Sequence, residues 1–285
     1  MIERDGFVWT IGQYVELACI LEASAPKAGN VHPGASFADM TYVDFVASAI
    51  AVAPVFDRVA DRGVGATILA AVERRRAVVH ANTNLGIVLL LAPLSAVDRD
   101  TPLPEGIGPV LERLTVADAR AVYQAIRQSR AGGLGRTDAQ DVAEEPTCTL
   151  REAMRLAADR DLIARQYVND FADVLNEGVN LLRAATQTGP TLLDAIVHAH
   201  LDILARHPDT LVARKRGLPV AHDVSRRAAA VLNAGFPAER AQSSFQAFDA
   251  WLREPGSGRN PGATADLVTA SLFAAFRDAI IPWSR

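Results

Sequence analysis

The sequence has few cysteines, few lysines and no long apolar run, and each shortage excludes a class of protein. Its 285 residues include only Cys19 and Cys148, too few for a disulfide framework and not spaced as a metal knuckle. The longest apolar stretches, 45–56 and 85–97, each contain proline and fall short of the roughly 20 residues that span a bilayer. The N-terminal segment carries early acids and no basic start followed by an apolar run. We therefore expect no signal peptide, no membrane partner and a cytoplasmic protein.

The charge balance argues against nucleic acid as a partner. The chain has 29 lysines and arginines against 33 aspartates and glutamates, a formal net charge of −4, whereas nucleic-acid-binding domains are typically basic. A hydrophobic content of 49% and a charged content of 22% are those of a globular protein with a large core. Only Lys27 and Lys215 are lysines, so these two positions stand out in a chain that otherwise uses arginine.

Apolar residues recur at three- and four-residue intervals along most of the chain, and no segment sustains a period of two. Acids three residues after Thr41 and Thr149 have capping-box spacing. We predict an all-α fold, a single globular domain over residues 1–285 with about ten or more helices. The predicted helices are 8–25, 43–60, 85–94, 116–130, 150–158, 162–182, 192–206, 225–234, 238–252 and 265–280. The predicted breaks are the proline-rich segment 98–108 and the segment 131–147, rich in glycine and acids.

The segment between the first two predicted helices is longer than most helix-to-helix connections. It reads PKAGNVHPGASFADM over residues 26–40 and contains Lys27, Gly29, Asn30 and Asp39, whereas such connections usually have about 2–8 residues. A lysine in an arginine-rich chain suggests a compact ammonium group that grips phosphate. An ordinary loop is the alternative explanation.

The segment HANTNLG at residues 80–86 precedes an apolar helix and offers more capping residues than one helix needs. Asn82, Thr83 and Asn84 are all good N-cap residues. One of them is expected to cap the helix, and the others can present amide and hydroxyl groups to a phosphate or a sugar.

The segment HPDTLVARKRG at residues 207–217 contains the second lysine beside an acid. Asp209 and Thr210 are suited to cap a short helix, and Arg214 and Lys215 are suited to a solvated face. The alternative is a phosphate site at which Asp209 holds a bridging divalent cation.

A glycine-rich turn runs into the last predicted helix, with the sequence GSGRNPGATAD at residues 256–266. Exposed N–H groups of such a turn, near Asn260 and Gly262, can bind an anion, and Asp266 follows in the helix. The turn is not a P-loop, because the glycine spacing and the Lys-Ser/Thr pair are missing.

Three acids in the predicted helix 162–182 share one face. Asp170, Asp173 and Glu177 stand three and four residues apart, so they either ligate a metal together or form a solvated stripe. His198 and His200 lie two apart on different faces, which argues against joint ligation. If the three acids ligate a metal together, the chain would be a helical phosphohydrolase with metal-bound carboxylates, which is one alternative function.

Four motifs occur in the order found in one known family. The chain resembles the triphosphoribosyl-dephospho-CoA synthases, all-helical enzymes that make a prosthetic-group precursor. The resemblance covers essentially the whole chain and consists of Glu22 with PKAGNV and ADM, NTNLG at 82–86, PDT at 208–210 and NPGATADL at 260–267.

The resemblance implies a transferase that joins C1′ of the ATP ribose to the 2′-hydroxyl of 3′-dephospho-CoA and releases adenine, with ATP as substrate and Mg²⁺ as cofactor. From their residue chemistry, the four segments supply candidates for each role, and Glu22 or Asp39 would act as the base. The metal ligands would be Asp39, Asp209 and Asp266. The nucleotide and phosphate ligands would be Lys27, Gly29, Asn30, Asn82, Thr83, Asn84, Thr210, Arg214, Lys215, Asn260 and Gly262.

The chain departs from the family pattern in the second motif. Asn84 and Leu85 stand where the family has histidine and lysine, and PKPG has become PKAG. This form resembles a branch found where methanopterin-type cofactors are made, so an ATP-dependent step in a one-carbon cofactor pathway is a second hypothesis. A nucleotide-binding helical protein without turnover is a third. The expected partners are small nucleotide and coenzyme A-like molecules, and a homodimer is possible.

Overall fold

The computed structural model describes residues 8–129, 142–254 and 256–282. Within these ranges the chain is helical, and its only β contacts are two isolated bridges in the loop of residues 26–40. None of the described helices is long and apolar enough to cross a membrane. In chain order the helices are α1 (Ile11–Ser24), α2 (Tyr42–Phe56), α3 (Val59–Arg62), α4 (Val64–Val78), α5 (Leu85–Ser95), α6 (Leu103–Glu112), α7 (Val116–Ser129), α8 (Leu150–Arg155), α9 (Leu162–Gln166), η1 (Asp173–Gly178, a π-helix), α10 (Val179–Thr188), α11 (Leu192–Arg206), α12 (Thr210–Arg216), α13 (Leu218–Asn233), η2 (Glu239–Ala241), α14 (Gln242–Arg253), η3 (Gly256–Arg259) and α15 (Gly262–Arg277).

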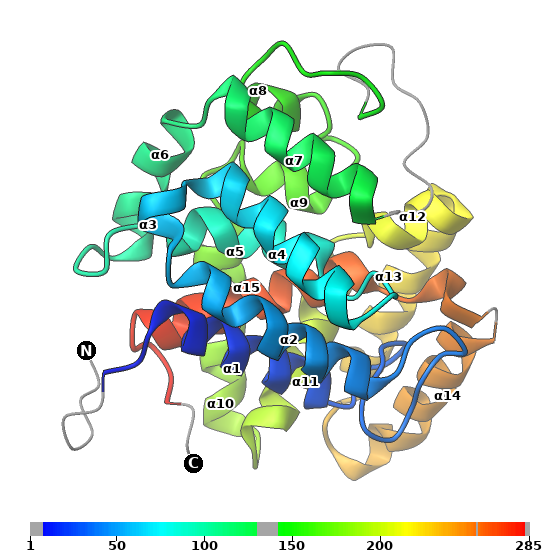
Figure 1. The fold of residues 1–285 in the computed structure, drawn as a ribbon. Helices are drawn as coiled ribbons and strands as arrows, with labels where there is room; N and C mark the ends of the chain where they lie inside the picture. The colour runs from blue at the N-terminus through cyan, green and yellow to red at the C-terminus, as the bar shows by residue number, and fades with distance from the viewer. Residues whose placement is uncertain (1–7, 130–141, 255, 283–285) are drawn as a thin grey trace.

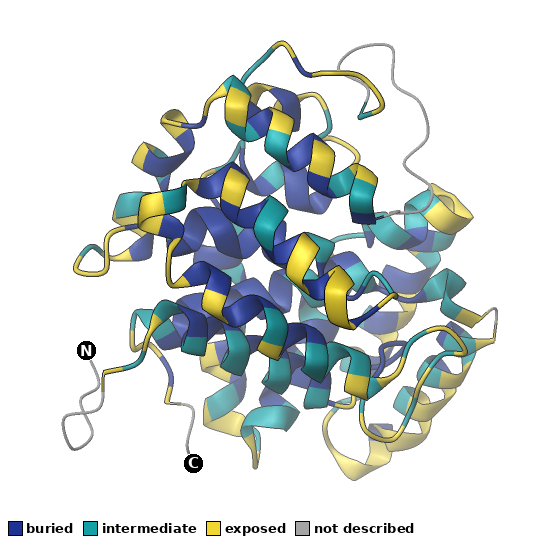
Figure 2. Cartoon of the chain, in the orientation of Figure 1, coloured by how far each residue is buried: buried dark blue, intermediate teal, exposed yellow. Residues whose placement is uncertain are grey.

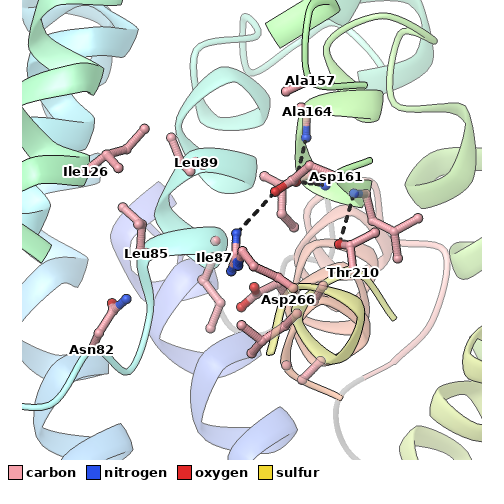
Figure 3. Close-up of a pocket in the computed structure, with 18 of the residues that line it drawn as sticks. Asn82, Leu85, Ile87, Leu89, Ile126, Ala157, Asp161, Ala164, Thr210 and Asp266 are labelled. Carbon is pink, nitrogen blue, oxygen red and sulfur yellow. Dashed lines mark hydrogen bonds and ion pairs between the residues drawn. The ribbon is translucent and has the colours of Figure 1, made fainter. Parts of the chain in front are cut away.

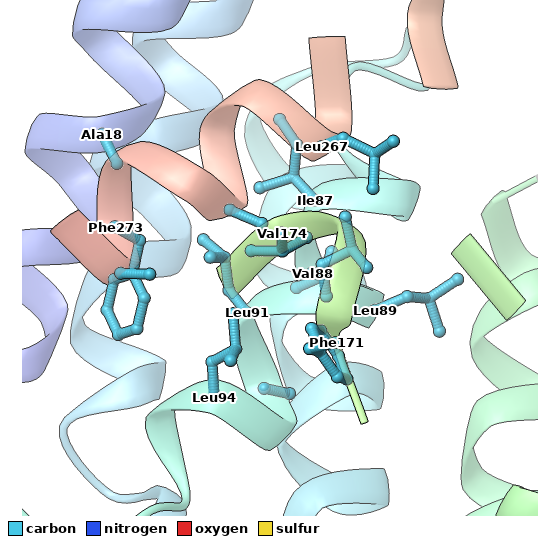
Figure 4. Packing of buried hydrophobic residues seen from close by; sticks show 14 of the residues in the cluster. Ala18, Ile87, Val88, Leu89, Leu91, Leu94, Phe171, Val174, Leu267 and Phe273 are labelled. Carbon is cyan, nitrogen blue, oxygen red and sulfur yellow. The ribbon is translucent and has the colours of Figure 1, made fainter. Parts of the chain in front are cut away.

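Helices α5 and α15 form the centre of the molecule. Nine of the 11 residues of α5 and 12 of the 16 of α15 are buried, and a helix that is apolar on all sides must be surrounded by other elements. Figure 4 shows α15 crossing α5 and η1, with Leu267, Leu91 and Val174 among the buried side chains between them. The polar start of each central helix is thereby brought into the interior.

The remaining helices surround this centre. Helices α1, α2, α4 and α7 lie side by side across one face (Figure 1), and in Figure 2 their inward sides are buried while their outward sides are partly or fully exposed. A second apolar cluster joins α11, α12, α13 and α14. The prediction of one all-helical domain is confirmed.

Most predicted helices are present, and the differences have local causes. The capping boxes at Thr41 and Thr149 form as predicted and start α2 and α8. Helices α4 and α6 were not predicted, because arginines dilute the apolar pattern of the first and prolines interrupt the second. The predicted helix 162–182 is broken where Asp170 and Phe171 adopt positive φ angles of 53° and 60°. The expected break at 131–147 lies largely outside the described residues.

A close contact between α1 and α2 depends on Gly12. A Cβ atom there would lie 2.4 Å from the carbonyl oxygen of Ala53, and the Gly12 amide donates to Asp57 Oδ1 at 2.6 Å. Only glycine allows the two backbones this approach.

We expect Gly12→Ala to lower the free energy of unfolding by about 1–3 kcal/mol, because the two helices must separate. Gly108→Ala in α6 is the matched control, since a Cβ there meets nothing within 4 Å, and helix propensity predicts a gain of up to about 1 kcal/mol. Urea denaturation of both variants tests this. Equal effects of the two substitutions would contradict the packing argument.

Candidate active site

The elements of the fold leave one large cavity of about 1010 Å³ between the starts of α5, α9, α12 and α15 and the end of α1. Of the fifteen predicted site residues, twelve line it: Glu22, Asn30, Asp39, Asn82, Thr83, Asn84, Thr210, Arg214, Lys215, Asn260, Gly262 and Asp266. Segments that are far apart in the sequence thus supply one site.

The cavity has a polar side and an apolar side. Figure 3 shows Asp161, Thr210 and Asp266 together on one side, with Leu85, Leu89 and Ile126 facing them from the other. The apolar side continues along α7 and α8 through Val122, Leu150 and Met154. A ligand that fills both sides must therefore combine polar and apolar parts.

Asp266 is the acid at the centre of the polar side. Burial and the negative charges of Glu22, Asp209 and Asp161 raise the pKa of Asp266 well above its ordinary value, and Arg214 offsets this only partly. A Cβ at position 86 would lie 2.0 Å from Asp266 Oδ2. Gly86 of the NTNLG motif therefore leaves the room that this carboxylate occupies.

Glu22 faces the cavity from the end of α1 and is held from behind by Lys27. The Lys27 ammonium lies 3.0 Å from Glu22 Oε1 and also donates to the backbone carbonyls of Glu22 and Ala25. Burial raises the pKa of Glu22 and lowers the pKa of Lys27, against the attraction between them. With three acceptors for its three N–H groups, Lys27 is satisfied within the protein.

Asp161 joins the start of α9 to a cation in the cavity. Its Oδ1 accepts from the amides of Ile163 and Ala164 at 2.8 and 3.2 Å, which caps the helix. Its Oδ2 lies 3.5 Å from Arg214 Nη1, and both contacts of the carboxylate can be followed in Figure 3. Thr210 adds a second contact to α9 by accepting from the Leu162 amide.

Several polar atoms at the cavity are buried without a hydrogen-bond partner among the described residues. They are Asn30 Oδ1, Asn82 Oδ1, Asn84 Oδ1 and Arg214 Nε. Asn84 occupies the N-cap of α5, yet its side chain makes no capping bond. Since buried polar groups are normally satisfied, these atoms indicate that a polar ligand completes the site.

Three predicted site residues lie outside the cavity lining. Lys27 is occupied by Glu22 as described. The Gly29 amide donates to Asp249 Oδ1 at 2.7 Å, and its φ of 74° favours glycine. Asp209 is fully buried and accepts from the amides of Val212 and Thr264, at 2.9 and 2.8 Å, so it ties the start of α12 to the start of α15.

Asp39 and Lys215 belong to the edge of the site. Asp39 lines the cavity from the exposed end of the loop of residues 26–40. Lys215 Nζ donates to the Ser257 carbonyl at 3.0 Å, and burial lowers its pKa while the nearby Asp39 raises it.

Five acidic or basic residues that line the cavity are not among the predicted site residues: Asp159, Arg160, Asp161, Arg165 and His207. The position of Asp161 directly before an apolar segment was the one available signal, because that is where capping acids occur.

The acids of the predicted helix 162–182 do not act as a group of three. Asp170 leaves the group and pairs with Arg151 at 2.6 Å. Asp173 and Glu177 instead meet His207, with one candidate ligand atom from each within 4.8 Å of the others. This pairing depends on the break at Asp170 and Phe171, which periodicity does not reveal.

The raised pKa of Asp266 predicts an unusual effect of substitution. An acid whose pKa is raised in the folded state stabilises the fold while it is protonated, and that stability is lost as the pH rises through the folded-state pKa. We therefore expect Asp266→Asn to raise the Tm of the ligand-free protein by a few degrees at neutral pH, with a smaller gain at lower pH.

Differential scanning calorimetry across the pH range measures this effect. Asp159→Asn is the matched control, because Asp159 also lines the cavity but is exposed. A lower Tm for Asp266→Asn at neutral pH would show that the carboxylate is compensated in the folded protein.

Comparison with known proteins identifies the family. Residues 8–284 match the CitG family model, described as ATP:dephospho-CoA triphosphoribosyl transferase. A solved structure from Archaeoglobus fulgidus, assigned as a triphosphoribosyl-dephospho-CoA synthase, matches with a TM-score of 0.64 and 27% identity over 82% of this chain and 98% of that chain. No curated protein matches the sequence. Because the family model covers nearly the whole chain, this protein belongs to the CitG family of ATP:dephospho-CoA triphosphoribosyl transferases.

Proposed function

We propose that the cavity joins the triphosphoribosyl group of ATP to 3′-dephospho-CoA and that Glu22 is the base of this reaction. The observation that carries the proposal is the convergence of Glu22, Asp161 and Asp266 with Arg214 in one cavity that also has an apolar side. This combination suits a substrate with phosphates, a ribose and uncharged groups.

Glu22 has the environment of a general base. Burial raises the pKa of its carboxyl group, which brings its proton affinity closer to that needed near neutral pH. In the proposed step the bond between C1′ of the ribose and adenine breaks, and a bond from C1′ to the acceptor oxygen forms. The acceptor hydroxyl gives its proton to Glu22, while the departing adenine is protonated by water. Lys27 fixes the carboxylate from behind.

The other polar residues fit the remaining needs of the reaction. Arg214 and Lys215 line the cavity and would bind phosphate oxygens, and the unpartnered amide oxygens of Asn82 and Asn84 would accept from ribose hydroxyls. A developing positive charge at C1′ would be stabilised by the nearby carboxylates, as in glycoside cleavage.

The residues at the centre of the polar side also fit Mg²⁺. Asp266 is buried close to the negative charges of Glu22, Asp209 and Asp161, with only partial compensation from Arg214. Carboxylate oxygens are donors that Mg²⁺ prefers. Asp266, with Asp39 at the edge, would hold the ion, which would supply positive charge to the triphosphate. Asp209 does not fit this role, because its oxygens already accept from backbone and hydroxyl donors.

The proposal is tested by incubating the protein with ATP and Mg²⁺, with and without 3′-dephospho-CoA, and detecting adenine and the adduct by mass spectrometry. We expect both products only when the acceptor is present. Glu22→Gln should lower kcat by about 10²–10⁴-fold, the range of general base catalysis, with the KM for ATP little changed. A Glu22→Gln enzyme with full kcat would assign the base to another group.

A related acceptor is the second candidate. Leu85 lines the apolar side of the cavity, and Asn84 lies beside it, at the two positions of the NTNLG motif where the chain departs from the family pattern. Adenine release with a one-carbon cofactor precursor, but not with 3′-dephospho-CoA, would favour this candidate. ATP that is bound but left intact with every acceptor would favour a binding protein without turnover.

We also expect a homodimer. Val43 and Ile50, on the outward side of α2, are 70% and 54% exposed, and apolar side chains on such a surface are commonly covered by a second subunit. Light scattering after size exclusion measures the mass directly, and Ile50→Glu should shift a dimer toward the monomer. A wild-type mass equal to that of one chain would contradict this expectation.

A further inference from the structure

Arg165 is a cation of the cavity that the proposed mechanism does not use. It lies in α9 and lines the cavity, with its side chain 32% exposed. The two cations that the mechanism does use have protein partners: Arg214 faces Asp161, and Lys215 donates to the Ser257 carbonyl.

The guanidinium group of Arg165 is held on two of its nitrogens. Its Nε lies 2.7 Å from Asp173 Oδ2, which also accepts from Gln166 Nε2 at 2.6 Å. Its Nη2 lies 3.2 Å from His207 Nδ1. An arginine has five N–H donors and no acceptor. The contacts at Nε and Nη2 leave the Nη1 donors of Arg165 without a hydrogen-bond partner among the described residues.

The contact with Arg165 determines the tautomer of His207. Because a guanidinium can only donate, His207 Nδ1 must accept, and the ring proton is on Nε2. That proton points to Glu177 Oε2 at 2.6 Å. Arg165, His207 and Glu177 therefore form a chain of hydrogen bonds with one consistent direction.

The same contacts argue against a metal at Asp173, Glu177 and His207. Asp173 is paired with Arg165, and Glu177 also faces Arg206 Nη1 at 3.5 Å. Both ring nitrogens of His207 are occupied. A cation would have to displace a guanidinium, whereas an anion on the free side of Arg165 would displace nothing.

We propose that Arg165 binds a phosphate group of one of the two nucleotide substrates, with Asp173 and the His207–Glu177 pair as positioning residues. The inference rests on the proposed function and adds a third phosphate-binding cation to Arg214 and Lys215. A guanidinium fixed in one plane loses less entropy when it binds a phosphate, which is the value of these positioning contacts.

Isothermal titration of ATP, 3′-dephospho-CoA and inorganic triphosphate, each alone, tests the role of Arg165. We expect Arg165→Gln to weaken at least one of them about tenfold or more, the effect of losing one charged hydrogen bond. Arg206→Gln is the matched control, because Arg206 also faces Glu177 but does not line the cavity. It should leave all three affinities unchanged.

The three ligands separate the outcomes. A loss for ATP alone assigns the phosphate to the donor, and a loss for 3′-dephospho-CoA alone assigns it to the acceptor. If the protein binds triphosphate but neither nucleotide, the proposed function fails while Arg165→Gln still tests the anion site. Unchanged affinities in Arg165→Gln, equal losses in both variants, or a wild-type protein that binds none of the three would overturn the inference.

The positioning role has its own test at His207. His207→Ala removes the acceptor for Arg165, whereas His207→Asn keeps an oxygen near the position of Nδ1. We expect the alanine variant to lose several-fold in affinity for the same ligand and the asparagine variant to recover most of that loss. Equal losses in the two variants would overturn the positioning role and leave only a packing role for His207.

Discussion

The burial of several carboxylates around the start of α15 is the constraint on which the site depends. Asp266 is surrounded by the charges of Glu22, Asp161 and Asp209, and isolated buried charges are costly. The fold offsets this cost at three of the four positions: Lys27 pairs with Glu22, Arg214 faces Asp161, and backbone donors satisfy Asp209. Asp266 is left with the least compensation.

The buried and poorly compensated carboxyl group of Asp266 lowers the free energy of unfolding, but it can serve ligand binding. Stability at neutral pH would improve if Asp266 were neutral, so its presence points to a ligand that supplies positive charge or a proton donor. The unpartnered amide oxygens of Asn82 and Asn84, on the other side of the cavity, also indicate a ligand that donates hydrogen bonds. The site is therefore built to be completed by a ligand.

The central helices explain why the site can be both polar and rigid. Helices α5 and α15 are buried along most of their length, so their first residues are fixed relative to each other by packing. Gly86 and Gly262 allow the close approaches at these starts: a Cβ at Gly86 would meet Asp266, and one at Gly262 would meet Leu211 at 2.6 Å. Both motif glycines thus have a packing reason as well as a place at the cavity.

Ion pairs behind the cavity wall hold some of the side chains that line it. Lys27 pairs with Glu22, and Asp173 pairs with Arg165, so each holds a side chain that lines the cavity. Lys27, which the sequence suggests as a phosphate ligand, instead holds a neighbouring side chain in the structure. Arg165, which belongs to none of the four motifs, lines the cavity. The charge of a residue predicts that it lies near the site. It does not predict whether the residue lines the cavity or lies behind a residue that does.

The sequence by itself determined the helical class, the capping boxes at Thr41 and Thr149, the family and the four motifs that meet at the site, because these depend on local periodicity and residue type. Only the tertiary structure decided that Lys27 and Asp209 contact other groups of the protein and do not line the cavity. The local sequence is compatible with either arrangement. It also decided that Asp173 and Glu177 meet His207, because a backbone break at Asp170 and Phe171 redirects the chain. Contacts between residues distant in the sequence arise from packing, which local pattern does not encode.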